Sequence, residues 1–212
     1  MPAKPDVIDS ELEPWGDETL DGGFVIEDAL VEADLSGARA AGGRIARSRL
    51  ERVALTGARL RSLVLVDIVA NAIEASAGDW TGGRVNRTTF DGCRMSGLIL
   101  GLLEADDVVF RNCQLKLVNF GYAKLRHVTF EDCVLDEADF TGATLRDVRF
   151  ERCQILRADF SHAALTRVDF RGSELEPVGD VNGLRGAMID VVQLAGLAPA
   201  LARAAGILVD TD

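Results

Sequence analysis

The chain has 212 residues, of which 48% are hydrophobic, and a formal net charge of −11. None of its apolar runs approaches the roughly 20 residues that a membrane helix needs, and its first residues contain no apolar stretch that resembles a signal peptide. These features argue against a membrane-spanning or secreted protein and predict a soluble, cytoplasmic protein whose cysteines are reduced.

Residues 1–25 are predicted to be an acidic N-terminal arm. They carry seven acidic side chains against Lys4, a net charge of −6. Trp15 and Leu20 fit a backward continuation of the repeat described below, but Glu13 and Gly23 stand where that repeat has small apolar residues. Two arrangements stay open: an arm that is partly disordered, or an arm laid across the first repeat with Trp15 as its anchor.

Residues 26–177 repeat with a period of five. Every fifth residue from Leu30 to Leu175 is nonpolar, and the residue two places before each of these centres is mostly small or branched. A period of twenty is superposed, because VTFEDCVLDEADFTGATLRD (128–147) is followed by VRFERCQILRADFSHAALTR (148–167). Neither period matches the 3.6 residues of a helix or the two of a plain strand. A repeat architecture is therefore predicted.

A five-residue unit can be built from extended chain. The small residue points inward, the next points outward, the centre points inward, and two residues turn a corner. Four such sides close a square after twenty residues, and stacked squares place equivalent residues about 4.8 Å apart, the spacing of paired strands. The predicted columns hold like residues: Phe90, Phe110, Phe130, Phe150 and Phe170 on one side, and Met95, Leu115, Leu135, Ile155 and Leu175 on another.

Three five-residue segments, ADLSG (33–37), ADFTG (138–142) and ADFSH (158–162), resemble the A(D/N)LXX pattern of the pentapeptide repeat family. The resemblance extends over residues 26–177 with no break in register. It implies an all-β fold, a right-handed quadrilateral β-helix with twenty residues per coil. Such repeats supply a surface and specify no chemistry of their own.

The same register predicts structural roles for the cysteines and histidines, residue types that commonly act in catalysis or metal binding. Cys93, Cys113, Cys133 and Cys153 fall in one inward column, and the short CxxC pairs of a metal site are absent from the sequence. Parallel Cβ vectors and a reducing compartment disfavour disulfides between them. His127 and His162 fall at exposed corners, and there is no phosphate-binding GxxxxGK(S/T) motif. We therefore predict no catalytic residue, no metal site and no cofactor.

Several outward positions are apolar and suggest a contact surface. They are Val64, Val66 and Val69, followed by Ile99, Leu102 and Val109. Because the nearby centres Ala70, Ala75 and Ala105 are small, a distorted coil with partly exchanged inward and outward residues is an equal alternative to a contact patch for a partner.

Residues 178–212 lack the five-residue period and are predicted to be a helical cap or a dimerisation segment. Asp190 with Gln193 resembles a helix N-cap with its reciprocal partner, Pro199 suits the first turn of a second short helix, and Gly206 would end it. The apolar stripe comprises Leu194, Leu197, Leu201 and Ala205. It would cover the end of the core or pair with a second copy, as the C-terminal helices do in the dimeric gyrase-protecting members of the family.

Two non-catalytic functions follow. The first is a scaffold that binds an unidentified protein. The alternative, implied by the resemblance, is a DNA mimic that modulates DNA gyrase and protects against quinolones. Such a mimic needs a sustained negative surface, whereas residues 26–177 hold 23 acidic against 20 basic side chains, a net charge of −3. The scaffold is favoured, with no direct binding of nucleic acid or membrane. Its candidate charged surface is Glu131, Asp132, Asp136, Glu137 and Asp139.

Overall fold

The computed structural model describes residues 1–16 and 19–208. Asp17, Glu18 and residues 209–212, which belong to the predicted terminal segments, lie outside the described residues. Short strands make up most of the fold. In chain order the elements are η1 (Asp9–Glu11), β1 (Glu13–Pro14), β2 (Val25–Glu27), β3 (Ala29–Val31), β4 (Arg39–Ala41), β5 (Arg44–Glu51), β6 (Arg59–Arg61), β7 (Val64–Asn71), β8 (Arg84–Asp91), β9 (Glu104–Arg111), β10 (Lys124–Glu131), β11 (Thr144–Arg146), β12 (Arg149–Glu151), β13 (Gln154–Asp159), β14 (Ala164–Thr166), β15 (Val168–Asp169), β16 (Glu174–Val178), η2 (Val181–Leu184), β17 (Ala187–Met188) and α1 (Val191–Ala204).

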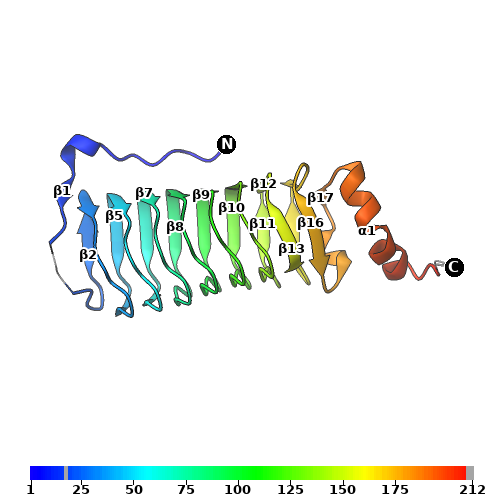
Figure 1. Cartoon of the computed structure of the whole chain (residues 1–212), viewed down its shortest axis with the longest axis horizontal. Helices are drawn as coiled ribbons and strands as arrows, with labels where there is room; N and C mark the ends of the chain where they lie inside the picture. Colours follow the sequence, from blue (N-terminus) through cyan, green and yellow to red (C-terminus); the bar gives the residue numbers. More distant parts are fainter. Residues whose placement is uncertain (17–18, 209–212) are drawn as a thin grey trace.

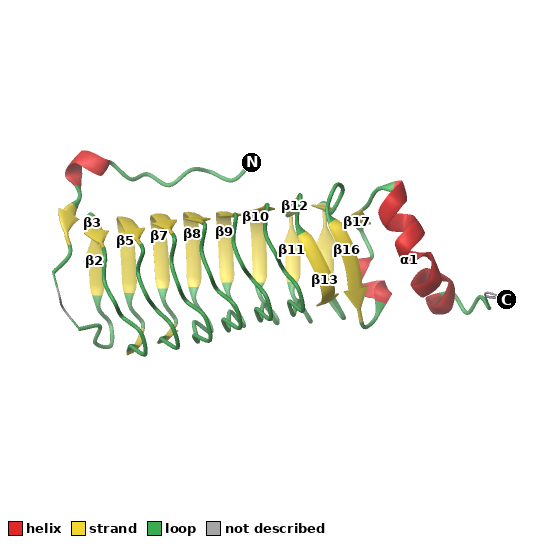
Figure 2. Ribbon diagram, in the orientation of Figure 1, coloured by secondary structure: helices red, strands yellow, loops and turns green. Residues whose placement is uncertain are grey.

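The strands of successive coils stack in parallel along one axis (Figures 1 and 2). β8 pairs with β9, β9 with β10 and β10 with β12. In these pairings Phe90 lies beside Phe110, Phe110 beside Phe130, and Phe130 beside Phe150, so each residue pairs with the residue twenty positions further on. The predicted all-β solenoid is therefore confirmed.

The core is a set of side-chain columns that follow the five-residue period. Every predicted centre from Ala40 to Leu175 is buried. The ring of Phe130 stacks on Phe110 at a centroid distance of 5.0 Å and on Phe150 at 4.9 Å, and it meets the edge of Phe120 at 6.0 Å. The coil spacing of about 4.8 Å sets the stacking distance. The second aromatic column fills the space beside the first with edge-to-face contacts.

The predicted register is wrong in the first coil, which is one residue shorter than the others. Ile26 pairs with Ile45 and Val31 with Leu50, an offset of nineteen residues, whereas Asp34 pairs with Ala54, an offset of twenty. As a result Val31 is buried and the predicted centre Leu30 is only half-buried. At the other end, β17 pairs with β15, so strand pairing continues beyond residue 177, where the sequence pattern stops.

The cysteine column has the predicted inward position. All four cysteines are buried and free. Each thiol lies near a backbone carbonyl of the preceding coil; the Sγ of Cys133, for example, is 3.3 Å from the carbonyl oxygen of Phe110. One coil beyond Cys153 the same position is occupied by Ser173, whose hydroxyl donates to the carbonyl of Phe150 at 2.9 Å. These residues are therefore small core side chains whose polar atoms are satisfied by the neighbouring coil.

The N-terminal segment closes the first coil and then turns back over the solenoid. β1 pairs with β3, the N–H of Trp15 donates to the carbonyl of Leu30 at 2.9 Å, and Leu20 is buried against the open end of the core. Trp15 is therefore an anchor on the first coil. Figure 1 shows that the residues before β1 run back along the row of coils. The described part of this segment therefore has the second of the two predicted arrangements, an arm laid across the first repeat with Trp15 as its anchor.

The described part of the C-terminal segment, residues 178–208, contains one α-helix and not the two that were predicted. α1 begins with the predicted capping box, in which the Asp190 carboxylate accepts from the N–H groups of Val192 and Gln193. Pro199 lies inside α1, where its ring leaves one helical carbonyl without its usual donor. α1 packs beyond the last coil (Figure 2). Among residues 1–16 and 19–208, no helix is long and apolar enough to cross a membrane.

Candidate interaction surfaces

The corners of the coils carry the side chains that differ most from coil to coil. The second residue after each centre from Ile45 to Phe170 has a positive φ, in the left-handed region. Most non-glycine residues pay a conformational cost there, and glycine occupies it freely. Corners without a side chain include Gly57, Gly97 and Gly142. Because the corner backbone is the same throughout, the chemistry of each surface column is set by which side chains stand there.

One corner column alternates between acidic and basic residues along the solenoid. We call it the charged corner; its members are Asp28, Arg47, Asp67, Arg87, Asp107, His127, Asp147 and Arg167. Arg47 binds Asp28 at 2.7 Å, Arg87 Nε donates to Asp67 Oδ1 at 2.6 Å, and Arg167 Nη2 donates to Asp147 Oδ2 at 2.6 Å. His127 takes the place of an arginine, with Nδ1 3.6 Å from Asp107 and Nε2 3.8 Å from Asp147.

These pairs favour the ionised carboxylates. Hydrogen bonds from the arginine of the next coil lower the pKa of Asp28, Asp67 and Asp147 below the usual value of an aspartate. Asp67 is the most enclosed of the three, with only 6% of its surface exposed. The Asp67–Arg87 pair is therefore the one expected to contribute measurably to stability, since fully exposed pairs contribute little.

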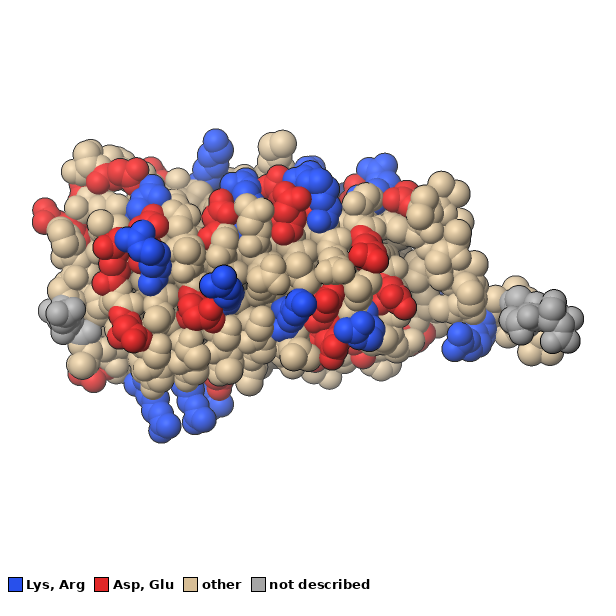
Figure 3. Space-filling model, in the orientation of Figure 1, with Lys and Arg blue, Asp and Glu red and all other residues tan. Residues whose placement is uncertain are grey.

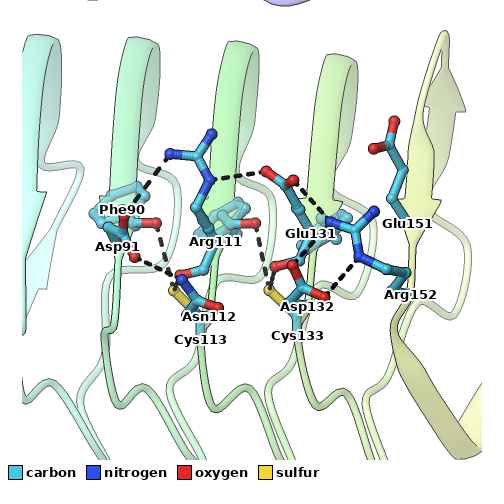
Figure 4. A network of polar contacts seen from close by, with 12 residues as sticks. Phe90, Asp91, Arg111, Asn112, Cys113, Glu131, Asp132, Cys133, Glu151 and Arg152 are labelled. Atoms are coloured by element: carbon cyan, nitrogen blue, oxygen red, sulfur yellow. Dashed lines mark hydrogen bonds and ion pairs between the residues drawn. The ribbon is translucent and has the colours of Figure 1, made fainter.

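Four of the five residues of the predicted charged surface form ion pairs with basic residues of the flanking coils. Figure 4 shows Glu131 between Arg111 and Arg152, which donate to it at 2.8 Å each, and Arg152 also binding Asp132 at 2.8 Å. The remaining members are engaged as well: Asp136 with Lys116, Glu137 with Arg157, and Asp139 with Asn119. Figure 3 likewise shows acidic and basic side chains interspersed on the visible face. The acidic residues therefore do not form a continuous negative face.

An exposed apolar patch lies on two adjacent coils. We define it by Ile99, Leu102, Leu117 and Tyr122, which are 44%, 59%, 59% and 65% exposed. Leu102 and Tyr122 occupy one corner column, Leu117 occupies the next corner, and Ile99 lies on the side between the two corners. The coils are joined by the hydrogen bond from the N–H of Leu102 to the carbonyl of Gly121, at 3.0 Å. The four residues therefore lie on one side of the solenoid and its two corners, within two neighbouring coils.

Two glycines lie on the side between the corners of the patch. Gly101 and Gly121 follow Ile99 and Asn119 there; Gly101 is half-buried and Gly121 is buried. The ring of Tyr122 leans over Gly142 in the next coil, where an added Cβ would lie 2.6 Å from Tyr122 Cε1. Because Gly142 has no side chain, the ring of Tyr122 has room to lie over it.

Residues 103–178 match the family described as Pentapeptide repeat region. The matched segment lies within the C-terminal half of the solenoid and reaches the last strand of the regular repeats, β16. Residues 103–178 are a pentapeptide repeat region. No curated protein matches the sequence of the chain.

Solved structures of pentapeptide repeat proteins are similar to this chain. HetL from the cyanobacterium Nostoc sp. strain PCC 7120, which is involved in heterocyst differentiation regulation, has 15% identity and a TM-score of 0.41, and the match covers 78% of this chain and 87% of HetL. QnrB1, a plasmid-mediated fluoroquinolone resistance protein, has 19% identity and a TM-score of 0.40 over 90% of this chain and 97% of its own. Rfr23 from the cyanobacterium Cyanothece 51142 has 12% identity and a TM-score of 0.35, over 55% and 88%.

The outward valines keep the register of the repeats. Val64, Val66 and Val69 are half-buried, while the neighbouring centres Ala70 and Ala75 are fully buried. The alternative of a distorted coil with exchanged residues is therefore wrong. Val109 is also half-buried, so of the predicted outward apolar residues only Ile99 and Leu102 belong to the exposed patch. Leu117 and Tyr122 were missed, although their corner positions in the repeat identify them as outward residues.

His127 is the centre of a cluster of three potential metal ligands. The ligand atoms of Asp106, Asp107 and His127 lie within 4.8 Å of one another. Other groups already engage both carboxylates: Arg126 binds Asp106, and the N–H of Ala3 donates to Asp107 Oδ1 at 3.1 Å. We therefore assign these side chains to the charged corner and its neighbours.

The stripe predicted on the C-terminal helix is divided between the core and the surface. Leu197 is buried against the last coil, and Gln193 Nε2 donates to the carbonyls of Phe170 and Ser173 at 2.6 and 2.7 Å. Leu194 and Leu201, in contrast, are 48% and 39% exposed, and Ala205 is exposed beyond the end of α1. One face of α1 therefore contacts the end of the repeats, and the rest of the stripe faces outward.

Proposed function

We propose that this protein is a non-catalytic scaffold that binds another protein through the apolar patch. The patch itself is the observation that carries the proposal. Large apolar side chains at its corners would be desolvated by a partner, and aromatic residues such as Tyr122 are enriched among the residues that dominate binding energy. Contiguous exposed apolar area on an otherwise charged surface typically marks an interaction site.

The charges of the repeats support a protein partner over the DNA-mimic alternative. A mimic of B-DNA would present unpaired negative charge at about the density of phosphates, one per about 1.7 Å of helix axis. Here Glu131 and Asp132 are bound by Arg111 and Arg152, and the corner carboxylates Asp28, Asp67 and Asp147 are bound by arginines. Most carboxylates of residues 26–177 have a basic side chain within ion-pair distance, and a minority stay unpaired for a cationic DNA-binding surface.

The test is affinity capture from native cytosol with paired variants, followed by mass spectrometry. Tyr122→Asp places a charge in the apolar patch, and His162→Asp places the same charge in the same corner column two coils away, at another residue with positive φ. The proposal predicts that a protein partner retained by the parent is lost with Tyr122→Asp and kept with His162→Asp. Equal retention by all three proteins would contradict it. Enrichment of gyrase, together with inhibition of DNA supercoiling, would restore the mimic alternative.

We further propose a homodimer through the outward part of α1. Val191, Val192, Leu194 and Leu201 are exposed on a helix that projects beyond the coils, and a second copy would cover them. Light scattering coupled to size-exclusion chromatography measures the mass directly. The parent is expected at twice the chain mass, and Leu194→Glu at the chain mass of 22.8 kDa. A monomeric parent would contradict this proposal.

A further inference from the structure

The N-terminal arm makes a regular series of polar contacts with the solenoid. The N–H of Ala3 donates to Asp107 Oδ1 at 3.1 Å, and the N–H of Asp6 donates to Asp67 Oδ1 at 3.1 Å. Further along, the carboxylate of Asp9 binds Arg49 Nη2 at 2.7 Å. The arm therefore runs opposite to the order of the coils (Figure 1). Its backbone is held by two carboxylates of the charged corner, Asp107 and Asp67.

The spacing of the arm residues matches the spacing of the carboxylates. Asp67 and Asp107 are two coils apart, which is about 9.6 Å at the usual strand separation. Ala3 and Asp6 are three residues apart, and an extended or polyproline chain rises about 3.1 to 3.4 Å per residue, hence about 9 to 10 Å. An extended peptide thus presents an N–H group to a corner carboxylate at every third residue without distortion.

The sequence of the arm suits this arrangement. Pro2 and Pro5 each precede a donating residue, and proline itself has no N–H group to leave unpaired. Proline also restricts the chain before binding, so that less conformational entropy is lost when the arm docks. Both the donor spacing and the stiffness of residues 1–6 therefore fit a groove built on repeating carboxylates.

The two acceptors differ in their other partners: Asp67 Oδ1 accepts from Arg87 Nε as well as from the N–H of Asp6, whereas the charged corner has no arginine in the coil after Asp107. Elsewhere arginine engages both carboxylate oxygens, as Arg87 does with Asp67 and Arg167 with Asp147. At Asp107 the basic position is held by His127, whose Nδ1 is 3.6 Å away. The Asp107 carboxylate can thus accept from a backbone N–H group. Beyond it, His127 and Asp147 line a half-open cavity of about 370 Å³ together with Met1 and Pro2.

We propose that the charged corner, from Asp67 to Asp147, is a binding groove for an extended, proline-containing peptide of another protein, and that residues 1–9 are its intramolecular occupant. The ligand is defined by N–H donors at every third residue with proline between them. The arm is held by two backbone hydrogen bonds and one exposed ion pair, contacts that a peptide of the same chemistry can replace. This groove lies at a different corner from the apolar patch, and the inference stands independently of the function proposed above.

The groove can be tested on the full-length chain by displacing the arm. Ala3→Pro with Asp6→Pro removes both N–H donors and leaves the solenoid residues unchanged. A synthetic peptide of residues 1–9 is then titrated, to several millimolar, into ¹⁵N-labelled parent and double variant. We expect saturable amide shifts at Asp67, Asp107 and His127 in the double variant, with an affinity at least tenfold higher than in the parent, where the arm competes.

Matched controls separate the groove from nonspecific binding. Asp107→Asn, added to the double variant, is expected to weaken peptide binding about tenfold, whereas Glu137→Gln, which changes an acid at another corner, is expected to leave it unchanged. A peptide that itself carries proline at positions 3 and 6 is expected not to bind. Absence of saturable shifts, equal affinity for parent and double variant, or equal effects of Asp107→Asn and Glu137→Gln would each overturn the proposal.

Discussion

The stacked phenylalanines predict that identical substitutions differ in effect according to their place in the column. Phe130, inside the column, makes four aromatic contacts: two stacked, with Phe110 and Phe150, and two edge-to-face, with Phe120 and Phe140. Phe90, at the end of the column, makes one, a stack on Phe110 at 5.0 Å. Both side chains are buried, with 0% and 3% of their surface exposed, so the loss of buried area on substitution by leucine is similar.

The difference between the two substitutions therefore isolates the aromatic contacts. Each aromatic pair contributes about 0.5–1.5 kcal/mol beyond the buried area. Phe130→Leu loses three pairs more than Phe90→Leu, and since the leucine recovers part of the packing, we expect it to lower the free energy of unfolding by about 2 kcal/mol more.

Urea denaturation followed by circular dichroism measures this difference, provided that the slope of the transition is the same for both variants. If the free energies of unfolding are compared at urea concentrations near the two midpoints, no long extrapolation to water is needed. Equal destabilisation by Phe130→Leu and Phe90→Leu would show that the buried volume alone determines the effect and that the stacking geometry contributes nothing. A larger effect at Phe90 would refute the reasoning altogether.

Three further predictions concern the charged corner, the cysteines and the helix cap. Arg87→Gln is expected to lower the free energy of unfolding by about 1–2 kcal/mol at pH 7. Arg87 lowers the pKa of Asp67 in the folded protein. The stabilisation by this pair is therefore complete above the pKa of Asp67 in the unfolded chain, about 3.9, and is lost as the pH falls through its pKa in the folded protein. Thermal melts at pH 7 and near pH 2 should therefore show a larger difference from the parent at the higher pH; a constant difference would contradict the assignment. The four buried thiols should react with a thiol reagent only after unfolding, and rapid labelling of native Cys133 would show that the column opens. Asp190→Ala removes the cap of α1 and its bond to Gly172, and should lower the urea midpoint; an unchanged midpoint would show that the cap does not contribute to stability.

The solenoid was predictable because its core repeats one simple rule. A period of five fixes which residues face inward, and every centre from Ala40 onward follows it. The rule fails where two adjacent residues fit equally well. Leu30 and Val31 are both apolar, so the pattern does not reveal that the first coil is a residue shorter and that Val31 is the one that is buried.

Features that depend on the ends and on single polar contacts were not predictable in the same way. Pro199 suggests a helix boundary, yet α1 continues through it while Leu197 and Gln193 hold the helix on the last coil. The apolar patch was only partly predicted. Ile99 and Leu102 were recognised as outward residues, whereas Leu117 and Tyr122 were missed although they occupy the same repeat position as Leu102. Two contacts of the arm are made by the backbone N–H groups of Ala3 and Asp6, and the identity of these residues does not predict such contacts.

The uniform left-handed corner also defines which amino acids the surface can use. Between residues 47 and 172 the corners hold arginine, aspartate, glutamate, asparagine, serine, alanine, leucine, tyrosine, histidine and glycine, and no valine, isoleucine, threonine or proline. Branching at Cβ and a proline ring both conflict with this backbone conformation. Among the residue types that this backbone allows, a substitution at a corner can change the charge, aromaticity or size of the side chain while the neighbouring inward residues stay the same. The fold thus separates the residues that determine stability from those that determine recognition, and new surfaces can evolve one corner at a time on an unchanged core.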